Sequence, residues 1–303
     1  RIFRDEYFQE CLSLHIGSGS NLLFINDFNG VILHSQIKGI SVAEETEDSV
    51  LLRIGAAEKW DDVVAYAVSE GWGGIENLSG IPGEAGAAAV QNIGAYGTEI
   101  KDVVETVETY NQLSFEKRMF TNEECLYSYR DSFFKNEHND PHIVTYINIR
   151  LSKKPQFSVN YGNLKEELAK YPEITLQAVR DAVISIRRQK LPDPDELGNA
   201  GSFFMNPVIP VARYEKLKEQ YPDMPSYPAG EGKVKIPAGW LIEQCGFKGK
   251  SHGAVGVYEK QALVLVNLGE AKGHEIALVA ESIRTAVHDR FGIEIMPEVK
   301  YVG

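Results

Sequence analysis

Three side chains in this sequence could carry acid–base or charge-stabilising chemistry, and Ser202 is the first of them. Ser202 lies in Gly-Asn-Ala-Gly-Ser-Phe-Phe-Met-Asn-Pro (198–207), between a glycine-containing turn and a bulky apolar pair. The segment lacks Gly-x-Ser-x-Gly and no His or Lys adjoins it, so it does not indicate a nucleophilic serine. A serine hydroxyl in a dry, well-ordered site can still donate a proton.

Arg130 and Glu298 are the other two candidates. Arg130, in Tyr-Arg-Asp-Ser (129–132), could grip a carboxylate or an enolate through two N–H bonds, or it could form a surface ion pair with Asp131. Glu298, in Met-Pro-Glu-Val (296–299), lies in a largely apolar terminal segment. It is either a functional carboxyl group or a solvated residue of an edge strand.

Two glycine-rich segments point to a bound cofactor. Ser79–Gly97 contains five glycines and five alanines. We expect it to contribute little to a core and to lay its main chain against a large flat ligand, because glycine permits positive φ and close approach. The alternative is a mobile linker, but linkers are usually richer in Ser, Pro and charge and lack an internal Val-Gln-Asn-Ile.

The second segment is Gly-Ser-Gly-Ser-Asn (17–21), which follows an apolar stretch. Successive backbone N–H groups in such a turn can form a concave site for phosphate oxygens, although the same residues are typical of an ordinary tight turn. A Rossmann fingerprint is excluded because position 22 is Leu22 and the following residues favour a strand over a helix.

The elements that must position these residues are strands and helices in irregular alternation. Asn29-Gly30 predicts a hairpin between Leu22–Ile25 and Val31–Leu33, and Thr-Asn-Glu-Glu (121–124) a capping box that opens a short helix. Periodicity predicts strands at 50–55, 103–110, 114–120, 143–151, 262–267 and 293–302, and helices at 59–70, 176–188, 211–220, 238–245 and 275–290. This pattern indicates an α+β protein with a domain boundary near residue 191, at Leu-Pro-Asp-Pro (191–194).

Composition narrows the functional classes. The chain has 303 residues, 43% of them hydrophobic, and a net charge of −12, which argues against nucleic-acid or membrane-surface partners. Its three cysteines are far apart in the sequence, so we expect no metal site and no disulfides, and free thiols in a reducing compartment. No apolar run is long enough to cross a bilayer. We therefore expect a cytoplasmic protein.

Together these motifs resemble the UDP-N-acetylenolpyruvoylglucosamine reductase family (MurB), flavoenzymes of bacterial cell-wall precursor synthesis. The matching segments follow the family's order across nearly the whole chain: 17–21, 81–83, 91–97, 129–132, 190–194, 198–204, 238–244 and 297–299. Tyr-Gly-Asn-Leu (161–164) resembles the loop of the longer subtype, whose tyrosine closes over bound substrate.

The resemblance implies a fold and its division along the chain. It implies an FAD-binding domain of the vanillyl-alcohol-oxidase/PCMH type and a smaller α+β substrate-binding domain. The expected ranges are 1–190 for the FAD-binding region, 191–291 for the substrate-binding domain, and 292–303 for a terminal strand that carries Glu298. Members of the family begin with an additional strand and helix, so we expect the N-terminal part of the flavin domain to be missing.

The resemblance also implies a reaction. FAD binds non-covalently, NADPH reduces it and leaves, and the hydride then passes to the enolpyruvyl group of a nucleotide-sugar substrate. Arg130 and Glu298 match the pair that stabilises the enolate-like intermediate, and Ser202 matches the general acid. The cofactor contacts implied are Gly17, Ser18, Gly19, Ser20, Asn21, Ile81, Pro82, Gly83, Gly86, Gln91, Asn92, Ile93, Gly94 and Tyr96. The substrate contacts implied are Tyr161, Lys190, Asn206, Tyr227, Lys235 and Gln261.

Some positions and alternatives stay open at this point. Met205 stands where relatives often carry lysine, which puts one substrate contact in doubt. For His15 and His34 we favour packing over covalent attachment of FAD. One rival is an FAD-dependent oxidase of the same superfamily, which would use oxygen instead of NADPH. Another is a catalytically silent flavin or nucleotide-sugar binding protein. We expect a monomer.

Overall fold

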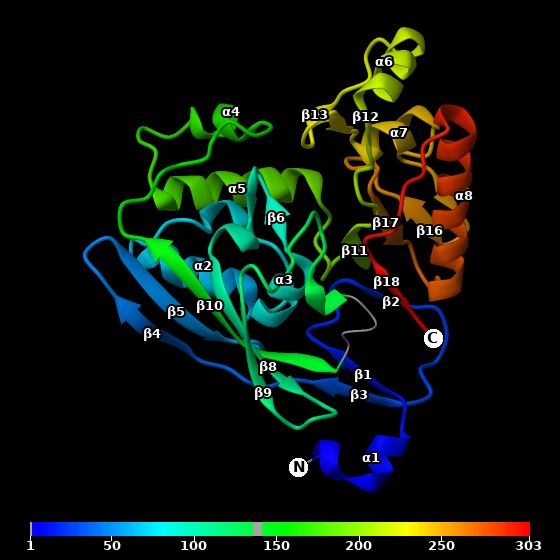
Figure 1. Ribbon diagram of the computed structural model, residues 1–303. Helices are drawn as coiled ribbons and strands as arrows, with labels where there is room; N and C mark the ends of the chain where they lie inside the picture. The colour runs from blue at the N-terminus through cyan, green and yellow to red at the C-terminus, as the bar shows by residue number, and fades with distance from the viewer. Residues whose placement is uncertain (1, 136–140) are drawn as a thin grey trace. The chain divides into compact units, whose positions relative to one another are not determined.

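The computed structural model describes residues 2–135 and 141–303 (Figure 1). The described chain forms two compact units. The first contains the residues up to Ser20 together with Asn29–Arg187, and the second contains Asn21–Phe28 together with Arg188–Gly303. The functional ranges expected from the sequence remain a prediction.

The first unit is built on an antiparallel sheet with strand order β4-β5-β10-β8-β9. Its strands are β4 (Ile40–Glu45), β5 (Ser49–Gly55), β8 (Val104–Asn111), β9 (Lys117–Thr121) and β10 (His142–Ser152). The predictions of strands at 50–55 and 143–151, and of a hairpin between 103–110 and 114–120, are therefore confirmed. Alternate β5 residues (Val50, Leu52 and Ile54) are fully buried, as the period of a strand with one covered face requires.

Helices α2 (Trp60–Ser69) and α3 (Ala85–Gln91) share the core of this unit with the sheet (Figure 1). The helix predicted at 59–70 is confirmed. However, Ala85, Ala88 and Ala89 are buried in the core, so the expectation that Ser79–Gly97 adds little to packing is wrong for α3. Small side chains pack here because they let the helix backbone come close to its neighbours.

The predicted Asn29-Gly30 hairpin is also wrong. β3 (Val31–His34) pairs in parallel with β1 (Ser13–Ile16), whereas β2 (Leu22–Phe24) pairs in parallel with β18 (Lys300–Val302). The two segments that we expected to pair lie in different units, and six residues separate them, too many for a two-residue hairpin turn.

The second unit contains the four-stranded sheet β11-β17-β16-β15, the three-stranded sheet β12-β14-β13, and the β18–β2 pair. Its remaining strands are β11 (Asn199–Ser202), β12 (Val208–Pro210), β13 (Tyr227–Pro228), β14 (Lys233–Lys235), β15 (Ser251–His252), β16 (Val255–Val257) and β17 (Val264–Asn267). Its helices are α6 (Val211–Gln220), α7 (Ala238–Gln244) and α8 (Gly273–Phe291). α8 buries Val279, Ala280, Ile283, Val287 and Phe291 in the core that it shares with β16 and β17 (Figure 1). The helices predicted at 211–220, 238–245 and 275–290 are confirmed.

Two local predictions need correction. The terminal strand is Lys300–Val302 and not 293–302. Pro297 has no N–H to donate to a sheet ladder, and residues 293–296 are not part of a strand. Thr121 and Glu124 do exchange the capping-box hydrogen bonds, at 2.9 and 3.3 Å, but they close turns and no helix follows.

The remaining elements are short, except for α5. The helix predicted at 176–188 is confirmed as α5 (Leu176–Lys190). The short elements are α1 (Glu6–Glu10), α4 (Leu164–Leu168), β6 (Gly94–Ala95), β7 (Thr98–Glu99), and the 3-10 turns η1 (Ile2–Arg4), η2 (Glu76–Leu78), η3 (Ile100–Asp102) and η4 (Phe133–Lys135).

We predict that Gly86→Ala lowers the free energy of unfolding by about 1–3 kcal/mol, as overpacking of a core does. A Cβ at this position would lie 2.8 Å from Ala56 Cβ and 3.3 Å from Ala56 O, so α3 would have to move off β5. Chemical denaturation followed by Trp fluorescence measures this. Gly269→Ala is the control, because no heavy atom lies within 4 Å of its added Cβ. Equal stability of the two variants would contradict the packing role.

Candidate active site

The turn Gly17–Ser20 lies against the start of α3, and glycine makes this close approach possible. A Cβ at Gly83 (φ +115°) would lie 3.1 Å from Ser20 Oγ, and a Cβ at Gly17 would lie 3.1 Å from Glu84 Oε2. Gly19 has a φ of +76°, which an L side chain rarely adopts. The two segments that we predicted to hold a dinucleotide are thus brought together. Their bare backbone fits a phosphate-bearing cofactor.

A buried carboxylate stands beside this turn. Glu84, which is 8% exposed, accepts a hydrogen bond of 2.7 Å from His34 Nε2. Gln36 Nε2 lies 3.3 Å from the other ring nitrogen of His34. His34 therefore serves as a partner for Glu84 and orients its carboxylate near the turn.

Residues Gln91–Gly97, here called the glycine loop, begin at the last residue of α3 and are fixed by side chains. Asn92 ends the helix in the left-handed conformation (φ +43°) and is fully buried. Its Nδ2 donates to Ser128 O at 2.7 Å and to Glu99 Oε2 at 3.1 Å. Asn was predicted as a cofactor contact here. The structure shows that its side chain also anchors the loop.

Arg130 lies on the glycine loop. Its Nη2 donates to Gly94 O at 2.6 Å and its Nη1 to Asn92 O at 3.4 Å. A Cβ at Gly94 would lie 2.9 Å from Arg130 Nη1, so glycine is required for this contact. The structure therefore joins one predicted catalytic residue to the predicted flavin-binding segment, which sequence distance alone did not show.

The backbone N–H and the carbonyl of Gly80, just before Ile81-Pro82-Gly83, are both hydrogen-bonded to side chains. Its N–H donates to Asp61 Oδ1 at 2.6 Å, and its carbonyl accepts from Arg187 Nε at 2.9 Å. Asp61 also receives two bonds from Arg180, at 2.6 and 2.8 Å. Burial lowers the pKa of Arg187 and raises that of the nearby Tyr96. Sequence analysis missed Asp61, Arg180 and Arg187, because side chains that bond a distant backbone group, or that bond each other, leave no spacing pattern.

In the second unit, Ser202 and Glu298 lie on neighbouring backbone segments. Glu298 N donates to Phe203 O at 2.8 Å, and Met205 N donates to Met296 O at 2.9 Å. Asn21 Nδ2 donates to Glu298 O at 3.1 Å. Phe203 and Phe204, each 1% exposed, anchor the segment that carries Ser202. The structure thus brings these two predicted catalytic residues together within one unit.

Four of the predicted substrate residues gather around β14 and the start of α7. Tyr227 and Lys235 are opposite each other in the β13–β14 pair. Asn206 Oδ1 accepts from Ala238 N at 2.8 Å, and a Cβ at Gly239 would lie 2.9 Å from Gln261 Oε1. The other two lie elsewhere: Lys190 ends α5, and Tyr161 lies in the first unit, beside Gly97.

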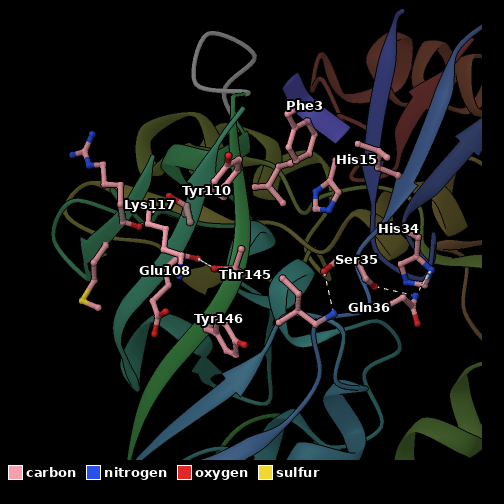
Figure 2. Close-up of a pocket in the computed structure, with 16 residues that line it drawn as sticks. Phe3, His15, His34, Ser35, Gln36, Glu108, Tyr110, Lys117, Thr145 and Tyr146 are labelled. Carbon is pink, nitrogen blue, oxygen red and sulfur yellow. Dashed lines mark hydrogen bonds between the residues drawn. The ribbon is translucent and has the colours of Figure 1, made fainter. Parts of the chain in front are cut away.

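The first unit also contains a cavity of about 750 Å³ that the sequence did not predict (Figure 2). Phe3, His15, Tyr110 and Tyr146 contribute rings to its lining, and Glu108 and Thr145 contribute polar groups. β1 leads from His15 directly into the Gly17–Ser20 turn. The cavity has a volume within the range of small-molecule sites in proteins, and aromatic rings form part of its lining.

Within the described residues, neither the cysteines nor a cluster of metal-binding side chains adds a candidate catalytic group. All three cysteines are free, and burial raises the pKa of the Cys125 thiol to about 11. Within residues 2–135 and 141–303, no group of three or more His, Cys, Asp or Glu side chains could hold a metal ion. No helix in that part of the chain is both long and apolar enough to cross a membrane.

Comparison with known families defines the class of protein first. Residues 10–112 match the FAD binding domain family, and residues 193–302 match the C-terminal domain of UDP-N-acetylenolpyruvoylglucosamine reductase. The chain is therefore an FAD-binding oxidoreductase, and the fold class predicted from the sequence is confirmed.

Individual relatives give the family. The chain is 52% identical to the UDP-N-acetylenolpyruvoylglucosamine reductase of Bacteroides fragilis over 95% of this chain and 87% of the relative. It is 52% identical to that of Porphyromonas gingivalis over 100% of this chain and 90% of the relative. The crystal structure of the Thermus caldophilus reductase has the same fold, with a TM-score of 0.66, 21% identity and coverage of 98% of this chain and 88% of that one. The chain belongs to the UDP-N-acetylenolpyruvoylglucosamine reductase family.

We predict that Asp61→Asn lowers the melting temperature more at neutral than at acidic pH. Burial acts to raise the pKa of Asp61, but hydrogen bonds from Arg180 and Gly80 N–H outweigh it, and the net shift is downward. A depressed pKa stabilises the fold above the unfolded-state value of about 4, and this stability is lost as the pH falls through the folded-state value.

Thermal unfolding of both proteins between about pH 3 and 7 measures this, and we expect their difference to shrink below about pH 4. The neighbouring Asp62, an exposed residue of the same helix, supplies the control Asp62→Asn. A difference that stays constant with pH would contradict the assignment.

Proposed function

We propose that this chain reduces the enolpyruvyl group of UDP-N-acetylenolpyruvoylglucosamine to a lactyl ether, giving UDP-N-acetylmuramate, with NADPH as the source of hydride. One observation carries the proposal: the Arg130 guanidinium is hydrogen-bonded to the glycine loop of a unit that contains an FAD-binding domain. A cation held at that loop can stabilise the negative charge that develops beside the substrate carboxylate during the reaction.

The residues of the first unit fit the cofactor. Gly17, Gly19 and Gly83 offer backbone without side chains, and a Cβ at Gly17 or Gly83 would lie 3.1 Å from a neighbouring side-chain oxygen. Bound FAD would supply the hydride-transfer chemistry that links NADPH to the terminal carbon of the enolpyruvyl group. Ile81–Gly83, Gly86 and Gln91–Tyr96 would hold its ring system.

The catalytic residues have separate roles. Arg130 would donate two N–H bonds to the substrate carboxylate and so stabilise the enolate-like charge that follows hydride addition. The carboxyl group of Glu298, in its protonated form, would share that charge through a hydrogen bond. Ser202 would then donate a proton to the carbon that bears the carboxylate, which completes the addition of H₂ across the double bond.

Local positive charge would bind the substrate to this acidic chain. Lys190 and Lys235 would attract its phosphates, while Asn206, Tyr227 and Gln261 would hold the sugar and nucleotide through hydrogen bonds. The pairing of Tyr227 with Lys235 across β13 and β14 supports this grouping.

We assign the chain to the longer subtype, in which Tyr161 closes over the substrate. A Cβ at Gly97 would lie 3.6 Å from Tyr161 Cβ, so the tyrosine segment is in contact with the glycine loop. We further propose that 1–190 binds FAD, that 191–291 binds substrate, and that 292–303 positions Glu298. The enzyme would act as a cytoplasmic monomer, and light scattering of the purified protein tests the last point.

We also propose that the adenosine end of FAD occupies the cavity in the first unit. Leu33 lines it, so Leu33→Trp should weaken FAD binding about ten-fold or more. Ile32→Trp is the control, because Ile32 is 44% exposed and successive strand residues face opposite sides. FAD titration of the apoprotein measures both variants, and equal affinities would contradict the proposal.

We expect that NADPH bleaches the flavin absorption band of the purified protein under anaerobic conditions, and that UDP-N-acetylenolpyruvoylglucosamine restores it. The two changes report the two halves of the reaction. Recovery only on admission of air would indicate an oxidase. A protein that binds no FAD would contradict the proposal.

In the same titration, we predict that Arg130→Ala slows recovery of the band by about 10²-fold or more while FAD stays bound, since electrostatic stabilisation is usually the largest catalytic contribution. Arg150→Ala is the control: it removes an equal charge from ion pairs with Glu44 and Glu105 on the sheet. Near-normal recovery in Arg130→Ala would remove Arg130 from the mechanism.

A further inference from the structure

Asn77 is a buried amide that the reaction described above does not use. It lies in η2 (Glu76–Leu78) and is 2% exposed. Both of its neighbours in the chain are hydrogen-bonded: the Glu76 side chain accepts from Gly74 N at 2.6 Å through Oε2, and Leu78 O accepts from Trp60 Nε1 at 3.0 Å. The side chain therefore projects from a rigid base.

The amide nitrogen of Asn77 joins two separate segments. Nδ2 donates to Tyr96 O at 2.9 Å and to Ser158 O at 2.7 Å. Tyr96 belongs to the glycine loop, where its φ is +48°. Ser158 comes three residues before Tyr161 in the chain. One side chain thus fixes the backbone of the glycine loop against the start of the tyrosine loop, residues 158–163.

The two segments also approach each other at this place. A Cβ at Gly97 (φ +84°) would lie 3.5 Å from Ser158 Oγ and 3.6 Å from Tyr161 Cβ, so the position leaves room for only a small residue. The glycine loop and the tyrosine loop therefore run close together beside the two hydrogen bonds of Asn77.

The other end of the amide has no partner. Asn77 Oδ1 is buried and accepts no hydrogen bond from the residues that the structure describes. A buried unpaired acceptor is costly and calls for an explanation. The unpaired Oδ1 adds no stability, so we explain the burial of the amide by the two hydrogen bonds that its Nδ2 donates.

We propose that Asn77 is a positioning residue that holds the tyrosine loop in register with the glycine loop, so that Tyr161 is placed for the nucleotide-sugar substrate. This inference rests on the proposed function and on the role of Tyr161 in it. Asn77 touches neither substrate nor cofactor in this account. It acts through Ser158 and Tyr96.

The role predicts a particular kinetic effect. Loss of the two hydrogen bonds would let the tyrosine loop move away from its binding position, which weakens substrate and transition-state binding alike. We expect Asn77→Ala to raise KM for UDP-N-acetylenolpyruvoylglucosamine about ten-fold, while kcat changes less than about three-fold. The KM for NADPH should change less, because Tyr161 has no proposed part in the reduction of FAD.

Asn122 provides a matched control. Its Nδ2 donates to Lys101 O at 2.8 Å and to Val104 O at 2.7 Å, which is the same two-carbonyl arrangement within the same unit. Neither carbonyl belongs to the glycine loop or the tyrosine loop. Asn122→Ala should therefore lower the melting temperature without changing KM.

Hydrogen exchange of the FAD-loaded enzyme supplies a readout besides turnover. We expect amides of residues 158–163 to exchange faster in Asn77→Ala than in the wild type and in Asn122→Ala. Asn77→Ser, which keeps one donor, should give an intermediate effect and serves if Asn77→Ala does not fold.

The outcomes separate the two proposals. A wild-type enzyme that fails to oxidise its reduced flavin with the nucleotide sugar would overturn the proposed function, but faster exchange at 158–163 would still support the link made by Asn77. If the wild type is active and Asn77→Ala matches Asn122→Ala in both KM and exchange, the positioning role is wrong.

Discussion

The chemistry proposed for the first unit depends on the backbone of residues 80–97. Side chains from other segments hold much of this backbone in place. Glycine and alanine provide the close approach that a cofactor needs, but they provide no side chains to hold the loop in place. Polar side chains from elsewhere supply that hold. Asp61 and Arg187 bind the two backbone groups of Gly80, Asn77 binds the carbonyl of Tyr96, and Arg130 binds that of Gly94.

The same need explains why the helix between these points is so poor in side chains. α3 packs on Ala56 through Gly86, and its N–H at that position donates to Ala56 O at 2.9 Å. A larger residue would lift the helix from the sheet and, with it, both the Gly83 turn and the glycine loop. The same glycine- and alanine-rich composition therefore allows both close packing in the core and close approach of a ligand to the backbone. From the sequence alone, that composition predicts only the contact with the ligand.

Elements with strong periodicity could be predicted, and elements defined by distant pairing could not. The buried stripe of α2 and the alternation in β10 each lie within one short window. By contrast, β2 pairs with β18 nearly 280 residues away, and the local Asn-Gly signal pointed to the wrong partner. Motifs in the sequence pointed to Arg130, Ser202 and Glu298, whose catalytic roles stay a prediction. Asn77 and Arg187, which donate to backbone carbonyls, were not predicted. Every residue type has a backbone carbonyl, so the residue that accepts such a bond carries no recognisable motif.

The two units solve the problem of placing reactive groups in different ways. In the first, side chains from other segments, together with Asn92 of the loop itself, hold a backbone that is poor in side chains. In the second, backbone holds backbone: Glu298 N bonds to Phe203 O, and two buried phenylalanines fix the strand that ends at Ser202. Asn21 then ties its side chain to Glu298 O, one residue after the Gly17–Ser20 turn of the first unit. A change at Asn21 would act on Glu298 without altering any residue of the glycine loop.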